Sequence, residues 1–293
     1  MSEPVVLGLD FGGTKIALAV CDAGGARLGS VTIPTRPAEG ARAVFTRTVA
    51  AARELLAGRL PAAVGAATFG IPGDGGVDLA PAVPGWEHLA LARELGAAFE
   101  GAAVRVVTDV KAAAGIEAGS GALAGCDPGL YLNLGTGLAV AIVAGGVVLN
   151  GRNGASGEIG YNLRALADVG VPPNGRVPLE DTVSGRALAE GAAALRPAAP
   201  HLGAALDSGD PAVGRLLGAF VGELAFHLVN LAIAVDPARI AVGGGMVRSW
   251  RHLHDGLRRA LDAAVPYPPE LVPARYPFDG PLRGALALAL AAV

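Results

Sequence analysis

The chain has 293 residues, 52% of them apolar, which is enough for a well-buried core in one large domain or two ordinary ones. Its formal net charge is −3 and it has no basic run, which argues against a nucleic-acid partner, since such a partner needs concentrated positive charge. Its two cysteines, Cys21 and Cys126, lie far apart, which excludes a disulfide framework and indicates a reducing compartment.

The N-terminal "MSEPVV" lacks the basic and long apolar parts of a signal peptide.

The first part of the chain alternates strands and helices. Strands are predicted at residues 4–10, 15–21 and 26–33, with the turn "DAGG" between the last two, and a helix over about 39–58. Next come a buried strand in "AAVGAATFGIPG", a helix in "LALARELGAAF", and a strand in "AVRVVTDV" that feeds the helix "KAAAGIEAGSGAL".

A second unit begins near residue 129 and resembles the first. "GLYLNLGTGLAVAIVAGGVVLNG" predicts three strands, followed by a loop-rich stretch over 150–180 and a long helical region over 182–234. The strand "RIAVGGG" and a helical and loop tail complete the chain. "LGLDFGGTKIALAVCDAGG" and "LYLNLGTGLAVAIVAGG" lie about 125 residues apart, which predicts two α/β lobes with a cleft between them.

The C-terminal "GALALALAAV" is too short to span a bilayer and predicts a buried helix. We therefore expect a cytoplasmic protein with neither a membrane partner nor a nucleic-acid partner.

Small glycine-rich loops follow strands in both units. "DFGGTK" sets Asp10 before two glycines, a threonine and a lysine, and "GTG" repeats the pattern at 135–137. Glycines beside a threonine let backbone N–H groups approach phosphate oxygens, and Asp10 is a candidate ligand for magnesium. A decorated turn is the alternative for either loop alone. A third glycine-rich segment, at 243–245, has two interpretations. Its missing side chains leave room for a flat base or ribose, or it forms a strand-to-helix turn that needs positive φ.

Three carboxylates are candidates for chemistry. Asp109 follows the strand "VRVVT", where open α/β sheets place reactive groups, although a helix N-cap is the alternative. Glu158 and Glu180 lie in loop surroundings and are candidates for binding the hydroxyls of a polyol, with simple solvation as the alternative.

The ordered set "LGLDFGGTK", "FGIPG", "VTDVKAAA", "LNLGTG", "NGASGEIG", "LEDTVSG" and "NLAIAVDPARIAVGGGM" resembles the ROK family (repressors, open reading frames, kinases) of sugar kinases. The likeness covers nearly the whole chain. It implies the α/β actin-like ATPase (ribonuclease H-like) fold, with two lobes of mixed β-sheet flanked by helices and the active site in the cleft. We expect a smaller lobe over 1–114, completed by the helix at about 281–293, and a larger lobe over 115–280.

The resemblance also implies roles for single residues. Asp109 matches the catalytic base, and Asp10 lies near the magnesium ion that accompanies ATP. The residues expected to bind the nucleotide are Gly12, Gly13, Thr14, Lys15, Gly135, Thr136, Gly137, Gly243, Gly244 and Gly245. Those expected to bind the acceptor are Thr108, Asp109, Glu158, Tyr161 and Glu180.

The sequence departs from the family in the segment that binds structural zinc. Members of the family typically carry a His after "GEIG" and then a Cys-rich loop, whereas Tyr161 stands here and "NLRALADVGVPPNGRVPLED" contains no Cys or His. We therefore expect no zinc. The loop is expected to hold Glu180 by packing and by the stiffness of Pro172 and Pro173.

Other departures concern the acceptor. Thr108 stands where the family usually has Asn, and Val83 replaces another Asn that contacts sugar. An apolar side chain opposite a hydroxyl leaves that hydroxyl unpaired, which disfavours glucose and favours an amino sugar or a cyclitol.

Taken together, these features predict an ATP- and magnesium-dependent kinase of a sugar or sugar-like cyclitol, and we expect a homodimer. A zinc-independent glucokinase is the main alternative. A non-catalytic sugar sensor is less favoured, because Asp109 is retained.

Overall fold

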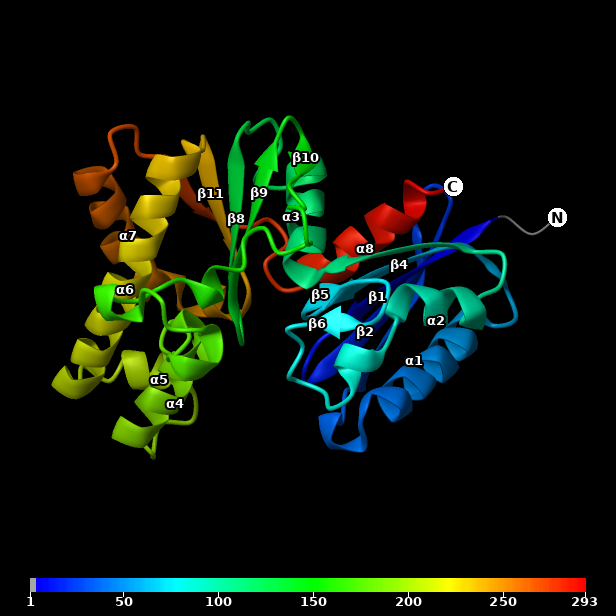
Figure 1. Cartoon of the computed structure of the whole chain (residues 1–293), viewed down its shortest axis with the longest axis horizontal. Coiled ribbons are helices and arrows are strands. Elements are labelled where there is room, and N and C mark those ends of the chain that lie inside the picture. The colour runs from blue at the N-terminus through cyan, green and yellow to red at the C-terminus, as the bar shows by residue number, and fades with distance from the viewer. Residues whose placement is uncertain (1–3) are drawn as a thin grey trace. The chain divides into compact units, whose positions relative to one another are not determined.

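The computed structural model describes residues 4–293 (Figure 1). The expectation that "MSEPVV" is no signal peptide falls partly on the first three residues, which lie outside the described part. The chain divides into two compact units. Unit 1 contains the residues up to Ile116, Asn150–Ala155 and Asp279–Val293, and unit 2 contains Glu117–Leu149 and Ser156–Phe278.

Unit 1 is built on a mixed five-stranded sheet in the order β3-β2-β1-β4-β7. Its strands are β1 (Val5–Phe11), β2 (Lys15–Asp22), β3 (Arg27–Pro34), β4 (Pro61–Thr68) and β7 (Ala103–Thr108). The first three pair antiparallel as hairpins, whereas β4 runs parallel to both β1 and β7. A separate small pair joins β5 (Ile71–Pro72) to β6 (Val77–Asp78).

Helices cover both faces of this sheet because its buried strands are apolar on both sides. Leu7 and Leu9 of β1 join the core formed with α1 (Ala41–Leu56) and α2 (Leu91–Ala98), whereas Val6 points the opposite way and packs with α8 (Gly280–Leu290). The close approach of α8 requires Gly65, since a Cβ there would lie 1.9 Å from the Ala285 carbonyl oxygen.

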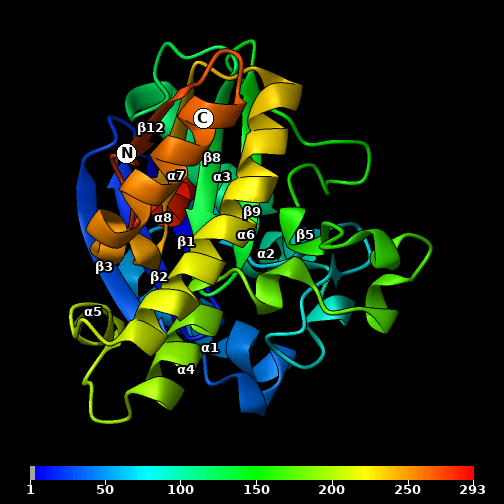
Figure 2. The same ribbon diagram turned by 90° about the vertical axis from the view of Figure 1, so that its left-hand side faces the viewer.

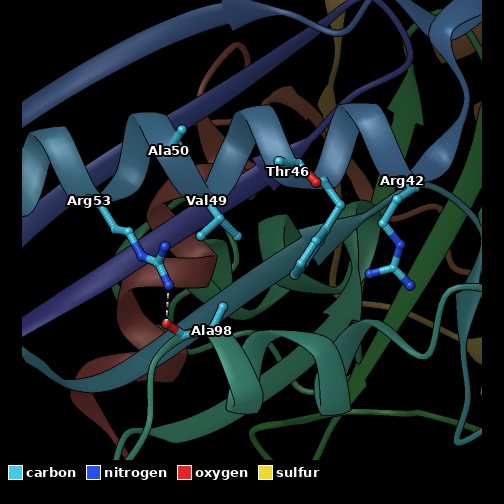
Figure 3. A pocket seen from close by; sticks show the side chains of 7 residues that line it. Arg42, Thr46, Val49, Ala50, Arg53 and Ala98 are labelled. Carbon is cyan, nitrogen blue, oxygen red and sulfur yellow. Dashed lines mark hydrogen bonds between the residues drawn. The ribbon is translucent and has the colours of Figure 1, made fainter.

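A shallow pocket lies between α1 and α2 (Figure 3). Arg53 crosses from α1 and donates to the Ala98 carbonyl oxygen at 3.2 Å, and Arg42 pairs with Glu94 of α2 at 2.7 Å. These exposed contacts tie the two helices together at the rim of the core.

Unit 2 carries a second mixed sheet in the order β10-β9-β8-β11-β12. Its strands are β8 (Gly129–Leu134), β9 (Leu138–Ala144), β10 (Val147–Val148), β11 (Arg239–Gly243) and β12 (Glu270–Pro273). β8 pairs antiparallel with β9 and parallel with β11. The sequence predicts only helix and loop in the C-terminal tail, where the structure has β12. Four residues are too few to show the alternation of apolar and polar side chains that marks a strand.

The helices of unit 2 are α4 (Gly185–Leu195), α5 (Leu202–Leu206), α6 (Pro211–Val235) and α7 (Trp250–Ala264). Figure 2 shows α6 and α7 over the strands, where Leu224 and Leu253 join a core with Leu130 and Leu132 of β8. The helical region predicted over 182–234 is broken into three helices, because prolines in "RPAAPH" and at the start of α6 interrupt it.

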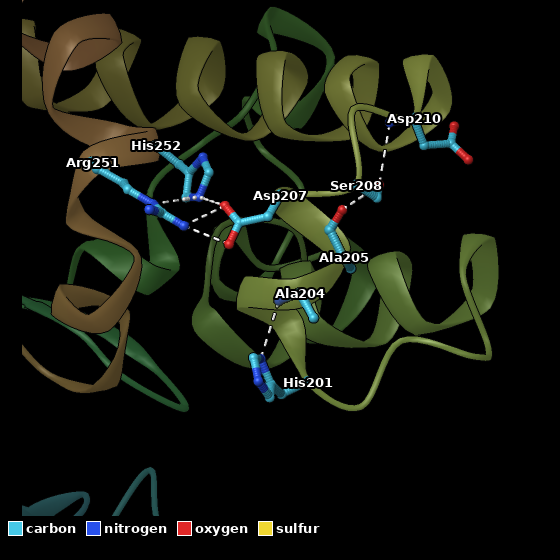
Figure 4. A network of polar contacts seen from close by, with 8 residues as sticks. All are labelled: His201, Ala204, Ala205, Asp207, Ser208, Asp210, Arg251 and His252. Atoms are coloured by element: carbon cyan, nitrogen blue, oxygen red, sulfur yellow. Dashed lines mark hydrogen bonds and ion pairs between the residues drawn. The ribbon is translucent and has the colours of Figure 1, made fainter.

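Asp207, which follows α5, links that helix to α7 (Figure 4). Its carboxylate pairs with Arg251 and, at 2.9 Å, with Nε2 of His252. These contacts fasten the short α5 to the longer helix.

Within the described range, α6 is the one helix long and apolar enough to cross a membrane by length and composition. Core helices of soluble proteins pass the same test. Phe220, Leu224 and Leu228 of α6 pack into the unit 2 core.

Short 3-10 helices occupy several loops. They are η1 (Pro37–Glu39), η2 (Trp86–His88), η3 (Ile159–Tyr161), η4 (Leu166–Asp168), η5 (Pro173–Gly175), η6 (Leu179–Asp181) and η7 (Gly245–Ser249). The remaining helix, α3 (Asp109–Ser120), starts directly after β7.

Candidate active site

The parallel strands of unit 1 end together. Phe11 at the end of β1 is in register with Thr68 of β4, which is in register with Thr108 of β7. Asp10 and Asp109 therefore lie at one edge of the sheet, the carboxyl edge where α/β proteins place their chemistry.

Asp10 is partly buried and its ionised form is disfavoured. Loss of hydration, with a further contribution from the negative charge of Asp109, raises its pKa to about 7, and the Lys15 ammonium partly offsets this rise. Two carboxylates that repel each other in a poorly hydrated place form a suitable site for a divalent cation, which would relieve the repulsion.

Asp109 is the first residue of α3, but it is not the residue that caps the helix. The Thr108 hydroxyl accepts a hydrogen bond from the Lys111 backbone N–H at 3.2 Å, which is the bond an N-cap makes. One Asp109 carboxylate oxygen accepts instead from the Val110 N–H at 2.8 Å. The alternative that Asp109 serves as the N-cap is therefore wrong.

The Gly12–Lys15 turn joins β1 to β2. The Gly12 N–H donates to the Lys15 carbonyl oxygen at 3.0 Å, and a Cβ on Gly12 would lie 2.7 Å from that oxygen, so the turn requires glycine here. Thr35 holds the turn from the side by donating its hydroxyl to the Gly12 carbonyl oxygen at 2.6 Å. Thr14 remains exposed at the tip.

Lys111 was not predicted from the sequence, and it is almost fully buried, with 6% of its surface exposed. Its ammonium donates to the Asn150 carbonyl oxygen at 3.0 Å, to the Asn150 side-chain oxygen at 2.9 Å, and to the Gly154 carbonyl oxygen. The lysine thus ties the start of α3, next to Asp109, to the segment that precedes Glu158. In sequence it looks like an ordinary helix residue, and no local pattern marks partners 39 residues away.

In unit 2 the "GTG" loop joins β8 to β9. The Gly135 N–H donates to the Gly137 carbonyl oxygen at 3.1 Å, and the Gly135 carbonyl oxygen accepts from Gly185 N–H at 2.8 Å. Thr136 is exposed at the tip, as Thr14 is in the first loop. The two loops therefore share a tight backbone turn that presents a threonine.

Local packing accounts for two glycines of the third cluster. A Cβ on Gly243 would lie 1.9 Å from the Tyr131 hydroxyl oxygen. Gly244 has φ +88° and lies against the Leu134 carbonyl oxygen, so the strand-to-helix turn itself requires glycine. Gly245 starts η7.

Glu180, Glu158 and Tyr161 lie near one another in unit 2. The Glu180 carboxylate accepts from the Leu138 N–H at 2.8 Å and lies where a side chain on Gly137 would be, so it sits directly against the "GTG" loop. Desolvation raises the pKa of the Tyr161 phenol, and the charges of Glu158 and Glu180 raise it further. The phenol is therefore neutral and can both donate and accept a hydrogen bond.

The predicted residues fall into two groups. Unit 1 contains Asp10, Gly12, Gly13, Thr14, Lys15, Thr108 and Asp109, and unit 2 contains Gly135, Thr136, Gly137, Glu158, Tyr161, Glu180, Gly243, Gly244 and Gly245. One expectation is wrong. Val83 is fully buried in the unit 1 core, which also contains Trp86, so its side chain does not line an acceptor pocket.

Across residues 4–293, no group of three or more His, Cys, Asp or Glu side chains is arranged to hold a metal ion. His252 pairs with Asp207 and His254 with Asp255, each at 2.9 Å. The zinc content of the protein stays a prediction for metal analysis.

Comparison with known proteins places this arrangement in one family. The family model described as "ROK family" matches residues 6–292, and the chain belongs to the ROK family. The actin-like ATPase fold of two mixed sheets flanked by helices follows from this membership and agrees with the observed topology.

Several relatives and solved structures match nearly the whole length of the chain. The chain is 32% identical to kanosamine kinase of Amycolatopsis mediterranei over 99% of this chain and 97% of that protein. The ROK hexokinase structure of Thermus thermophilus is 32% identical, with a TM-score of 0.76 over 96% of both chains. A ROK glucokinase of Streptomyces griseus, in complex with glucose and AMPPNP, is 28% identical, with a TM-score of 0.79 over 97% of this chain and 98% of that one.

Proposed function

We propose that the protein transfers the terminal phosphate of ATP to a hydroxyl of a sugar or sugar-like cyclitol, with Asp109 as general base. The observation that carries this proposal is the pair of carboxylates, Asp10 and Asp109, at the carboxyl edge of the unit 1 sheet. The family membership and the sugar kinases among its relatives support the same reaction.

The proposed chemistry assigns one task to each carboxylate. Asp109 accepts the proton of the acceptor hydroxyl. The hydroxyl oxygen attacks the terminal phosphorus of ATP, the bond from that phosphorus to ADP breaks, and ADP leaves. Asp10 would hold the magnesium ion that accompanies ATP, and that ion neutralises phosphate charge. Because Thr108 supplies the helix cap, the Asp109 carboxylate is not committed to that role.

The glycine loops are proposed to bind the nucleotide. Phosphate oxygens need several N–H and hydroxyl donors, and the exposed Thr14 and Thr136 stand on tight turns with backbone N–H groups beside them. Lys15 adds positive charge next to the first turn. The cluster at 243–245 is proposed to lie against the adenosine, although packing alone already requires two of its glycines.

We infer that the acceptor is an amino sugar rather than glucose. The kinase of the amino sugar kanosamine is among the similar proteins, and its likeness extends over nearly all of both chains. The Glu158 and Glu180 carboxylates beside a neutral Tyr161 would attract the ammonium of such a sugar. Tyr161 and Thr108 are the departures from the family in the proposed acceptor site, although Thr108 is buried and its hydroxyl caps α3. Val83 does not contribute, because it is buried in the unit 1 core.

The test is ADP release by the purified protein with magnesium and ATP. The acceptors are kanosamine, glucosamine, glucose and a set of cyclitols. We expect kcat/KM for an amino sugar to exceed that for glucose by roughly tenfold or more, because a mismatched polar group in a closed site is strongly rejected. Glucose as the best acceptor of the panel would favour the alternative of a glucokinase and would refute the amino-sugar proposal; the likeness to the glucokinase of Streptomyces griseus supports that alternative.

Sugar binding without ADP release from any acceptor would instead indicate a sensor and would refute the kinase proposal. We further propose a homodimer, which light scattering of the purified chain tests.

A further inference from the structure

The loop over residues 162–178 separates two elements of the proposed acceptor site. Tyr161 ends the short helix η3 before this loop, and Glu180 lies in the short helix η6 after it. The two short helices pack against each other. Ordering a loop of this length costs conformational entropy, so contacts that close the loop contribute to holding the two helices in place, together with the Glu180–Leu138 hydrogen bond.

Arg176 closes the loop. Its guanidinium donates from one terminal nitrogen to the Asn162 carbonyl oxygen at 3.0 Å and from the other to the Tyr161 carbonyl oxygen at 2.6 Å. The planar fork of arginine spans two neighbouring carbonyls, which the single ammonium of lysine does less well. The two prolines, Pro172 and Pro173, lie exposed at the start of η5, and their expected stiffening of the loop stays a prediction.

The start of the loop is also fastened to α6. The Asn162 amide lies 3.3 Å from Nδ1 of the buried His227, and Arg164 pairs with Glu223. The loop is thus anchored on α6 at residues 162 and 164, and Arg176 draws its far end back to the same anchor.

Charge within the loop supports this closure. Hydrogen bonds from the Arg164 and Ala165 N–H groups lower the pKa of Asp168, and the positive charge of Arg176 contributes to the same effect. Arg176 therefore also lies close enough to stabilise the Asp168 carboxylate that folds the first turn of the loop.

We propose that Arg176 is a positioning residue for the acceptor site. By binding the carbonyls of Tyr161 and Asn162, it keeps the Tyr161 phenol beside the carboxylates of Glu158 and Glu180. It acts through the backbone and does not touch the acceptor. The kinetic part of this inference rests on the proposed function, whereas the placement of Tyr161 does not.

The kinetic test compares Arg176→Ala with Arg259→Ala, a matched change at an exposed arginine of α7. We expect Arg176→Ala to raise the KM for the acceptor roughly ten- to hundredfold, because two charge-assisted hydrogen bonds are lost. The KM for ATP should stay within about twofold of wild type, since no nucleotide residue is changed. Added guanidinium ion, at a concentration that leaves wild type unaffected, should lower the acceptor KM of Arg176→Ala but not that of Arg259→Ala.

Equal acceptor KM values in the two variants would overturn the proposal, as would a parallel rise of both KM values in Arg176→Ala without rescue. If Arg176→Ala fails to fold, Arg176→Lys replaces it. That variant keeps the charge but loses the fork, so we expect a smaller rise of the acceptor KM, and no rise would count against the proposal.

A second test needs no activity. The chain is labelled with fluorotyrosine, and the Tyr161 signal is assigned by its loss in Tyr161→Phe. We expect the phenol pKa of Tyr161 to be lower in Arg176→Ala than in wild type, because the phenol moves away from the two carboxylates. An unchanged pKa would refute the placement role even if no acceptor is phosphorylated, and a failed acceptor panel with a lowered pKa would refute only the proposed function.

Discussion

Asp10→Asn is expected to stabilise the nucleotide-free protein, and to do so more strongly as pH rises. Asp10 has a pKa of about 7 in the folded protein, whereas an aspartate in water has a pKa of about 4. A carboxyl whose pKa is raised by folding contributes stability below its unfolded pKa and loses it as pH rises through its folded pKa. A rise of the pKa from about 4 to about 7 corresponds to a loss of about 4 kcal/mol once pH is above both values.

The loss occurs between the two pKa values, so part of it falls in an accessible range. Asparagine has no charge to desolvate and no repulsion with Asp109. The stability advantage of Asp10→Asn over wild type should therefore grow by roughly 2–3 kcal/mol between about pH 5 and about pH 8. A change of 1 kcal/mol in the free energy of unfolding shifts the melting temperature of a chain of this size by a few degrees. The melting temperature of Asp10→Asn near pH 8 should therefore exceed that of wild type by on the order of 5–10 °C.

The assay is thermal and urea unfolding of wild type and variant across that pH range, without magnesium or nucleotide. Asp74→Asn serves as the matched control, because Asp74 is exposed in a turn of the same unit. A stability advantage that does not change with pH, or one that Asp74→Asn reproduces, would show that burial does not raise the pKa of Asp10.

Three further predictions concern the packing and the metal. Lys111→Met should lower the free energy of unfolding by roughly 3 kcal/mol, because its acceptors in the 150–154 segment lose their donor; a urea midpoint equal to that of wild type would contradict this. Gly65→Ala should destabilise by about 1–3 kcal/mol or more because α8 must move, whereas Gly96→Ala, in open space on α2, should be neutral or mildly stabilising. The purified protein should hold no stoichiometric zinc, and chelation should leave its unfolding unchanged; about one tightly held zinc per chain would refute the expectation for residues 161–180.

Much of the fold could be predicted because it depends on local signals. The apolar runs of β1, β2 and β4 and the glycine turns between strands mark the first sheet, and a similar pattern at residues 129–148 marks the second. β12 could not be predicted, because its four residues form a strand only by pairing with β11, far back in the chain.

The candidate site divides in the same way. Asp109 and Glu180 stand in motifs that the chain presents locally, whereas Lys111 and Arg176 act through backbone carbonyls that a linear pattern does not pair with them. Val83 shows the opposite error. The resemblance to the family predicts that this side chain faces the acceptor, but Val83 lies in the unit 1 core with Trp86.

The measurement that tests the central claim most directly is turnover of Asp109→Asn on the best acceptor, together with its affinity for ATP. Asparagine keeps the size of the side chain but cannot accept the proton of the hydroxyl. We expect turnover to fall by roughly 10²–10⁴-fold, the usual scale for a positioned general base. The ATP affinity should stay within about twofold, because the turns around Gly12 and Thr136 are unchanged. A fully active Asp109→Asn protein would contradict the account and remove Asp109 from the mechanism.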